Sequence, residues 1–156
     1  MAREWCIIGS SIWTSLSLLG RATKVWRVNE YVIGDNMLPR LRGNTMIMKT
    51  AWRSNARTSE SDFYLSIEKP NPRGLAEFAC GGDVRFPGLA GFPITLQNLR
   101  GNIFHRTVGN NIDQPSMIFH QLILRTVGRT LWDYTSDCDL LTGFRDALKG
   151  ECFVNC

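Results

Sequence analysis

Short apolar runs separated by polar breaks rich in Gly and Pro make up most of this 156-residue chain. The continuous runs Trp5–Ile8 and Thr45–Met48 predict strands that are covered on both faces. The segment Lys24–Ile33 predicts two strand pieces joined by a tight bend at Asn29 and Glu30. Met117–Val127 is the longest apolar stretch of the second half, and it predicts a central strand that ends at Gly128.

The remaining elements follow from weaker periodicity. Near the N-terminus the strand pattern competes with a helical one, because Ile12, Leu16 and Leu19 recur at helical spacing. Further along the chain, the pattern predicts strands at Phe63–Ile67, Ile94–Leu99 and Cys152–Val154, a helical turn or two at Leu75–Cys80, and an amphipathic helix at Leu140–Leu148 that stops at Gly150. Together these elements predict an α/β fold in which residues 1–156 form a single domain, with one mixed, mostly parallel sheet flanked by a few helices.

Composition indicates a globular protein rather than a disordered one, with 44% hydrophobic and 21% charged residues. The net charge is +4, and the Arg residues are dispersed along the chain. A nucleic-acid-binding domain more often shows a basic run or stripe, so an anionic small molecule is the favoured partner and nucleic acid stays open as the weaker one.

The five cysteines do not predict a metal site, since Cys152 and Cys156 are the closest pair and no second pair accompanies them. An odd count suits a reducing compartment, and we therefore expect a cytoplasmic location. The apolar, Ser-rich segment from Trp5 to Gly20 could be read as part of a signal peptide, but Glu4 spoils the positive n-region. The segment is too short to span a membrane, and we expect no membrane association. The sequence does not indicate the oligomeric state.

The stretch from Val32 to Ser54 looks most like a site, because strand ends and loops meet in it. VIGDNMLP, followed by GNTMIMKTAWRS, resembles dihydrofolate reductases in order and in the spacing of Trp52 and Ser54. The later CGGDVRF and the terminal Glu151–Phe153 are similar to further segments of that family. Two departures stand out: Arg40 replaces a family Trp, and no carboxylate lies between the Leu-Pro and the Gly-x-Thr.

The resemblance implies an NADPH-dependent reductase that transfers hydride to a pterin-type small-molecule substrate, weakly or not at all without the carboxylate. It implies that backbone groups of Ile33 and Gly34 line a nicotinamide pocket, and that Lys49 and Thr50 meet a phosphate. Gly81 and Gly82 would let the backbone approach the pyrophosphate closely, because neither carries a Cβ atom. The catalytic residue stays unknown.

Two other hypotheses remain open. The chain could be a non-enzymatic, β-rich basic binding or shell-forming module, or a chain without an evolved function, because helical and strand patterns conflict in several places. Residue by residue, ordinary structural roles compete with the site roles. The glycines are also typical of turns, Trp52 of a core anchor, and His120 of a hydrogen-bonded core residue. Asp137 and Asp139 lack the Gly and the closing Glu of a calcium-binding loop.

Overall fold

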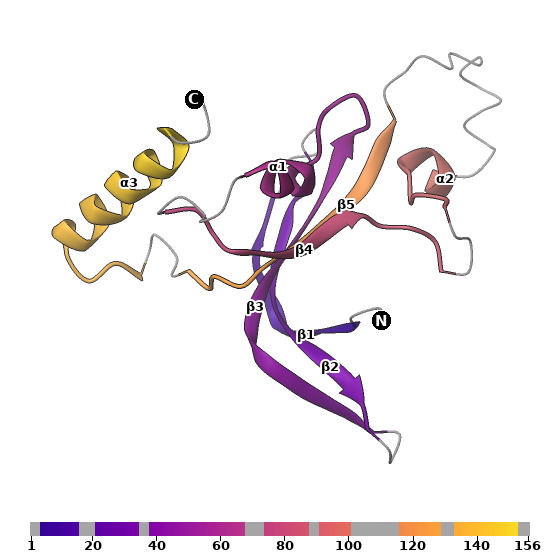
Figure 1. Ribbon diagram of the computed structural model, residues 1–156, viewed down its shortest axis with the longest axis horizontal. Helices are drawn as coiled ribbons and strands as arrows, with labels where there is room; N and C mark the ends of the chain where they lie inside the picture. Colours follow the sequence, from indigo (N-terminus) through magenta and orange to yellow (C-terminus); the bar gives the residue numbers. More distant parts are fainter. Residues whose placement is uncertain are drawn as a thin grey trace.

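A single antiparallel sheet forms the centre of the computed structural model, which describes residues 4–15, 21–34, 38–67, 74–87, 91–100, 116–128 and 133–152. The sheet has five strands in the order β1-β2-β3-β5-β4 (Figure 1). The strands are β1 (Glu4–Thr14), β2 (Lys24–Ile33), β3 (Pro39–Ser54), β4 (Phe78–Asp83) and β5 (Met117–Leu124). The helices are α1 (Glu60–Ser66), α2 (Leu96–Arg100) and α3 (Asp137–Cys152).

The predicted mixed, mostly parallel α/β sheet is wrong, because all four strand pairings are antiparallel. Nine residues connect β1 to β2, and five connect β2 to β3. Parallel neighbours need a crossover of about a dozen residues or more, so connections this short favour hairpins. The short connections are visible in the sequence, whereas the continuous apolar runs predict strands buried on both faces, which are typical of parallel sheets.

Strand β3 is central because β2 pairs with it on one side and β5 on the other. Its side chains point alternately to the two faces, so Met48 and Lys49 face opposite ways. Met48 joins Val28 and Ile123 in the main core cluster, and Trp26 and Cys80 pack against it. In the neighbouring strand β5, Leu122 pairs with Lys49 and is 1% exposed. The face of the sheet that carries Lys49 is therefore covered at this point as well.

Helix α1 replaces the predicted strand at Phe63–Ile67, and it lies across the sheet near β4 and β5 (Figure 1). Ser59 caps the helix, since its hydroxyl accepts a hydrogen bond from the backbone N–H of Asp62 at 3.0 Å. Tyr64 of the helix stacks on Phe78 of β4, with ring centroids 5.4 Å apart. In this capped helix Tyr64 therefore packs on β4, whereas Leu65 faces solvent.

Three further predictions need correction. The predicted helical turn at Leu75–Cys80 is wrong, because Phe78–Asp83 forms β4 against β5. The predicted strand Ile94–Leu99 survives only as a bridge between Thr95 and Ile118, after which α2 begins. Helix α3 continues beyond the expected stop at Gly150, so the predicted strand at residue 152 is wrong there, and residues 153–154 lie outside the described part of the chain.

The central strand predicted at Met117–Val127 is confirmed over Met117–Leu124, which forms the interior strand β5. The two strand pieces predicted at Lys24–Ile33 are wrong, because the segment is one continuous strand in which only the pairing register shifts, between Val28 and Glu30. Trp5–Ile8 lies in a strand, β1, but the prediction that both faces of it are covered is wrong, because Ile7 and Ile8 are exposed. Within the described residues, no helix is long and apolar enough to cross a membrane.

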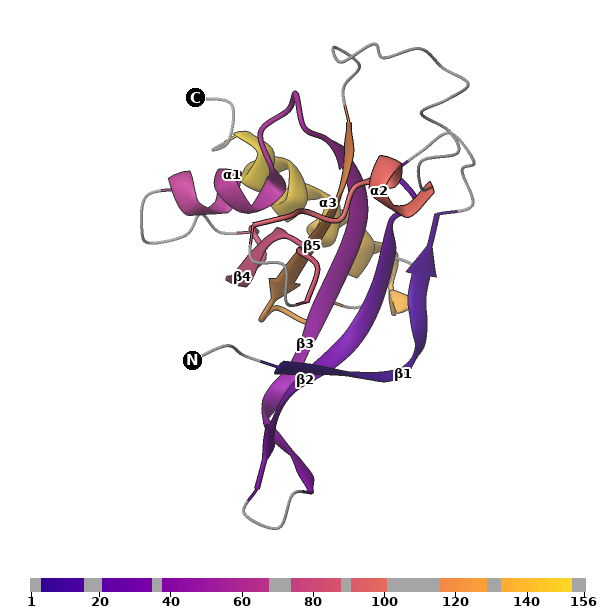
Figure 2. The same ribbon diagram turned by 90° about the vertical axis from the view of Figure 1, so that its right-hand side faces the viewer.

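The sheet narrows at one end to the β2–β3 hairpin, which extends away from the other strands (Figure 2). Strand β1 accompanies β2 as far as Tyr31, and β5 accompanies β3 only from Ile47 onward. The outer part of the hairpin therefore has no third strand beside it within the described residues, and Ile33 is exposed there. Leu41, in the last row beside β1, is exposed as well.

The core cluster and the outer hairpin should respond differently when a large side chain is replaced by alanine. Ile123→Ala should lower the free energy of unfolding by about 2–5 kcal/mol, because it empties a site in the core cluster. Leu41→Ala, in the exposed hairpin, should change it by less than about 0.5 kcal/mol. Urea denaturation followed by circular dichroism measures both, and equal losses would contradict the assignment of the core.

Candidate functional site

Lys49 of β3 and Glu60 of α1 form an ion pair on the face of the sheet opposite the core cluster. The Lys49 ammonium donates to both carboxylate oxygens of Glu60, at 2.8 Å and 2.7 Å. The two side chains are about one-third exposed (33% and 35%), so the pair contributes little to stability, on the order of 0–1 kcal/mol. Its main effect is geometric, since it holds a cation at a fixed place between the sheet and the helix.

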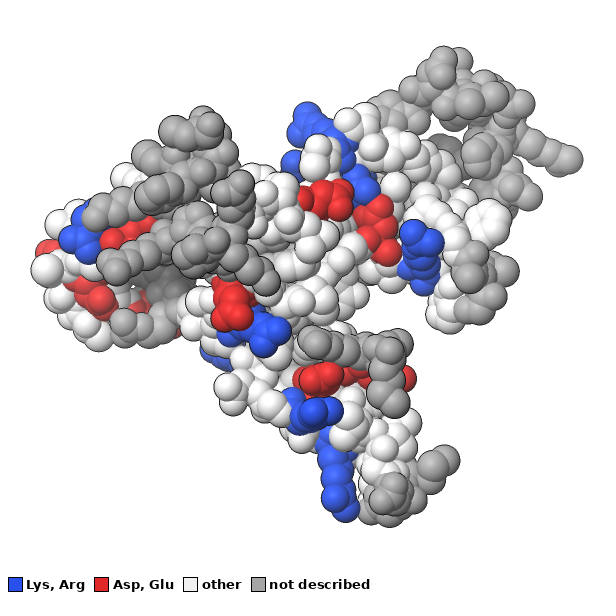
Figure 3. All heavy atoms as spheres, viewed as in Figure 1, with Lys and Arg blue, Asp and Glu red and all other residues white. Residues whose placement is uncertain are grey.

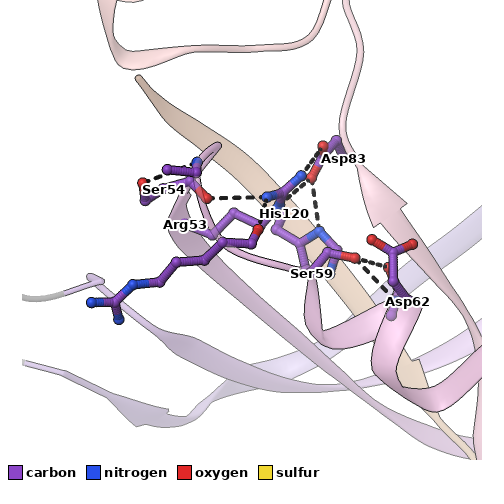
Figure 4. Close-up of polar contacts among 9 residues, drawn as sticks. Arg53, Ser54, Ser59, Asp62, Asp83 and His120 are labelled. Carbon is purple, nitrogen blue, oxygen red and sulfur yellow. Dashed lines mark hydrogen bonds and ion pairs between the residues drawn. The ribbon is translucent and has the colours of Figure 1, made fainter. Parts of the chain in front are cut away.

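A second polar cluster joins three strands at the end of the same face (Figure 4). Arg53 of β3 donates to both carboxylate oxygens of Asp83 in β4, from Nε at 2.7 Å and from Nη2 at 2.5 Å. His120 of β5 lies with Nδ1 2.9 Å from Oδ1 of the same carboxylate, and the residue is only 5% exposed. The prediction that His120 is a hydrogen-bonded core residue is therefore confirmed.

The partners of Asp83 decide its charge. Burial by itself would raise the pKa of Asp83, but hydrogen bonds from Arg53 and His120 and the positive charge of Arg53 hold that pKa below its usual value. An ionised carboxylate accepts hydrogen bonds and donates none, so the His120 Nδ1 carries the proton between them. The hydrogen bond to Asp83 raises the pKa of Arg53 in turn, so both partners keep their charge.

The residues expected to bind a cofactor do not all lie together. Ile33 and Gly34 lie at the tip of the hairpin, roughly 30 Å along the strands from Lys49 by the register of β2 and β3. Thr50 is 6% exposed and points to the face opposite Lys49. Gly81 lies in the same row of the sheet as Lys49, because both pair with Leu122, and Gly82 follows it in β4.

Packing within the sheet is enough to explain Gly81. A Cβ atom there would lie 2.8 Å from the backbone oxygen of Gln121 and 3.0 Å from Leu122 Cδ1. Contacts this short require the backbone to move, so β4 can approach β5 this closely only with glycine at this position.

Charge is distributed in separate patches on the face shown in Figure 3, where basic and acidic side chains lie next to one another. No continuous basic stripe is visible among the described residues on that face. Among those residues, no group of three or more His, Cys, Asp or Glu side chains is placed to hold a metal ion.

An ion pair between a lysine on the third strand and a glutamate on the following helix, as Lys49 and Glu60 form here, is also a feature of protein kinases. The sequence matches the model of the family described as fungal protein kinase over residues 2–152. The chain therefore belongs to the fungal protein kinase family. No curated protein and no solved structure gives a significant match.

This membership overturns the resemblance to dihydrofolate reductase, and with it the predicted reductase function and oxidoreductase class. The matching patches have a different structural origin: VIG and LP flank the tip of a hairpin, and the MIMK run is the centre of an antiparallel strand. The hypotheses of a shell-forming module and of a chain without evolved function are replaced as well. NADPH binding rested on the resemblance alone and stays an untested prediction.

Sequence reasoning missed Glu60 and the Arg53–Asp83 pair. Two patterns could have found the first: Met46-Ile47-Met48-Lys49 has the form of the kinase V-A-I-K strand, and Ser59 is followed by Glu60 in the first turn of a capped helix. Nothing local in the sequence links Arg53 to Asp83, since thirty residues separate them and only the strand order brings them together.

Kinases carry a glycine-rich loop with the pattern G-x-G-x-x-G-x-V, and the sequence between β1 and β2 does not reproduce it in full. Counted back from Val25, only Gly20 matches one of the three glycines, and it lies outside the described residues. Ala22 follows with φ of +44°, in the left-handed region that glycine favours, which costs an L-residue about 1–2 kcal/mol. The chain therefore keeps a glycine-like turn here with a non-glycine residue.

The lowered pKa of Asp83 predicts an acid-dependent loss of stability. Its ionised form contributes fully above the ordinary value of 3.8, and the contribution is lost as the pH falls through the lower folded-state pKa. Asp83→Asn should lower the free energy of unfolding by about 1–2 kcal/mol at pH 7. The gap between wild type and variant should narrow as the pH falls below about 4, because wild type then protonates too.

Glu77→Gln is the matched control, since Glu77 pairs with Arg125 at the other end of β4 and β5 in an exposed position. It should change stability by less than about 0.5 kcal/mol at either pH. A gap between wild type and Asp83→Asn that stays constant from pH 7 to pH 3 would show that Asp83 is not the titrating group.

Proposed function

We propose that this chain binds the phosphates of ATP as the nucleotide-binding part of a protein kinase, with Lys49 as the phosphate ligand. The observation that carries the proposal is the Lys49–Glu60 ion pair within a chain of the fungal protein kinase family. In protein kinases, the lysine of the third strand contacts the nucleotide phosphates only when the helix glutamate holds it in place. Lys49 and Glu60 have those positions and that contact.

The surroundings of Lys49 fit a nucleotide in two respects. Its ammonium is one-third exposed, so a phosphate oxygen can reach it without displacing the core. Val25 of β2 pairs with Lys49, and Ile47 lies two residues before Lys49 on β3. Val25 and Ile47 therefore lie on the same face of the sheet as Lys49. They offer an apolar surface of the kind on which a base stacks, next to the cation that binds the phosphates.

Phosphoryl transfer needs further groups. Kinases hold magnesium with the Asp of a D-F-G motif and accept the substrate proton with the Asp of an H-R-D motif. Neither motif occurs in the 156 residues, so we assign nucleotide binding to this sequence and assign it no catalytic residue.

Removing the cation should weaken ATP binding selectively. Lys49→Met should raise the Kd for ATP about 10–100-fold, because a charge-assisted hydrogen bond is worth about 1.5–3 kcal/mol. Glu60→Gln should raise it less, since the lysine remains but is no longer held. Titration calorimetry with ATP in the presence of magnesium measures the three affinities.

Lys24→Met is the matched control, because Lys24 is an exposed lysine of the neighbouring strand, and its Kd should equal that of wild type. NADPH is the comparison ligand, and it should bind more weakly than ATP. Equal ATP affinity in wild type and Lys49→Met, with both proteins folded, would remove Lys49 from the site and sink the proposal.

A further inference from the structure

Arg53 connects the edge of the sheet to the segment that leads into α1. It lies four residues after Lys49 on β3, so the two side chains share one face of the sheet. While Nε and Nη2 bind Asp83, Nη1 donates to the backbone oxygens of Ser54 at 3.1 Å and Arg57 at 2.9 Å. One planar group therefore binds β4 and the connection between β3 and α1 at the same time.

That connection is short, since only residues 55–59 separate the end of β3 from Glu60. The Arg57 oxygen held by Arg53 lies three residues before Glu60, and the Ser59 cap lies directly before it. Residues 54 and 57 also hydrogen-bond to each other through the backbone. Little freedom remains between the guanidinium and the start of the helix, so its position fixes where Glu60 stands.

Asp83 fixes the guanidinium in turn. Its two oxygens accept hydrogen bonds from Nε and Nη2 of Arg53. This two-point contact fixes the orientation of the guanidinium. His120 holds Oδ1 from the other side, and its own Nε2 is buried without a hydrogen-bond partner among the described residues. The carboxylate is thus restrained on both sides, in a cluster where Arg53 and Asp83 are mostly buried.

We propose that Asp83 and Arg53 are positioning residues for the Lys49–Glu60 pair, acting through the backbone oxygen of Arg57. Neither residue contacts Lys49, and their effect on it passes through the start of α1. The consequence for ATP rests on the proposed function, whereas the consequence for the Lys49 amine does not. Two measurements therefore separate the two proposals.

The first measurement follows the Lys49 amine without any nucleotide. Acetylation by a small amine-reactive ester, followed by peptide mass spectrometry, gives the labelling rate of each lysine. Glu60→Gln frees the ammonium and sets the reference for a released Lys49. Asp83→Asn should raise the Lys49 rate about 3–10-fold toward that reference while leaving the rate of Lys24 unchanged.

Arg53→Lys is the second variant, because it keeps the positive charge beside Asp83 but cannot bind Asp83 and the Arg57 oxygen together. It should raise the Lys49 labelling rate as Asp83→Asn does. If Asp83→Asn fails to fold, Arg53→Lys alone tests the positioning role. Two controls should leave the rate at the wild-type value: Glu77→Gln, which breaks an exposed ion pair, and Ile123→Val, which lowers stability from the opposite face.

The second measurement is the Kd for ATP, which should rise about 3–10-fold in both positioning variants. Wild-type labelling of Lys49 in folded Asp83→Asn and Arg53→Lys, with Glu60→Gln labelled faster, would overturn the positioning role and leave ATP binding intact. Faster labelling in a chain whose wild type does not bind ATP would support the positioning role and remove the proposed function. An increase that Ile123→Val reproduces would assign the effect to general destabilisation and also overturn the inference.

Discussion

The alternation of side chains along β3 is the constraint on which the rest of the molecule depends. Because neighbouring residues of a strand face opposite ways, Met48 enters the core cluster only if Lys49 faces α1. The same alternation places Arg53 on the Lys49 face, where it meets Asp83. A slip of one residue in the pairing would bury the lysine and expose the methionine, so the core that stabilises the sheet also orients the site.

The core cluster and the Lys49–Glu60 pair differ in how much they stabilise the fold. The core cluster is small among the described residues, with Val28 and Ile123 nearly inaccessible to water and aromatic rings packed around them. The Lys49–Glu60 pair adds little to stability because water reaches both partners. The Arg53–Asp83 contact, further along the same face, is better shielded from water.

The sequence predicted where several strands lie but not how they pair. Apolar runs located β3 and β5 correctly, since a strand in the interior of a sheet needs such a run whatever its neighbours. Strand direction depends on connection length, and the antiparallel pairing of β1, β2 and β3 follows from two connections too short for a crossover. Helix α1 was misjudged because Phe63 and Tyr64 suit strands, whereas the cap at Ser59 and the packing of Tyr64 on Phe78 favour a helix.

The candidate site was harder still. Lys49 is recognisable as a cation after an apolar run, but short patches of resemblance to dihydrofolate reductases assign it to the phosphate of a nicotinamide cofactor. Glu60 is eleven residues away and Asp83 thirty-four, and only the path of β3 into α1 and the place of β4 beside β5 bring them near. Contacts of this kind follow from topology, which local patterns do not contain.

The outer part of the β2–β3 hairpin differs from the site in how cooperatively it is held. Beyond Tyr31 its amides bond only across two strands, and the register shift after Val28 lies between that part and the five-stranded region. The outermost described pairs, Val32 with Arg40 and Ile33 with Pro39, can therefore open locally at a free energy well below that of global unfolding. Their amide exchange is then independent of the rows that contain Lys49, whose ammonium stays in place beside α1.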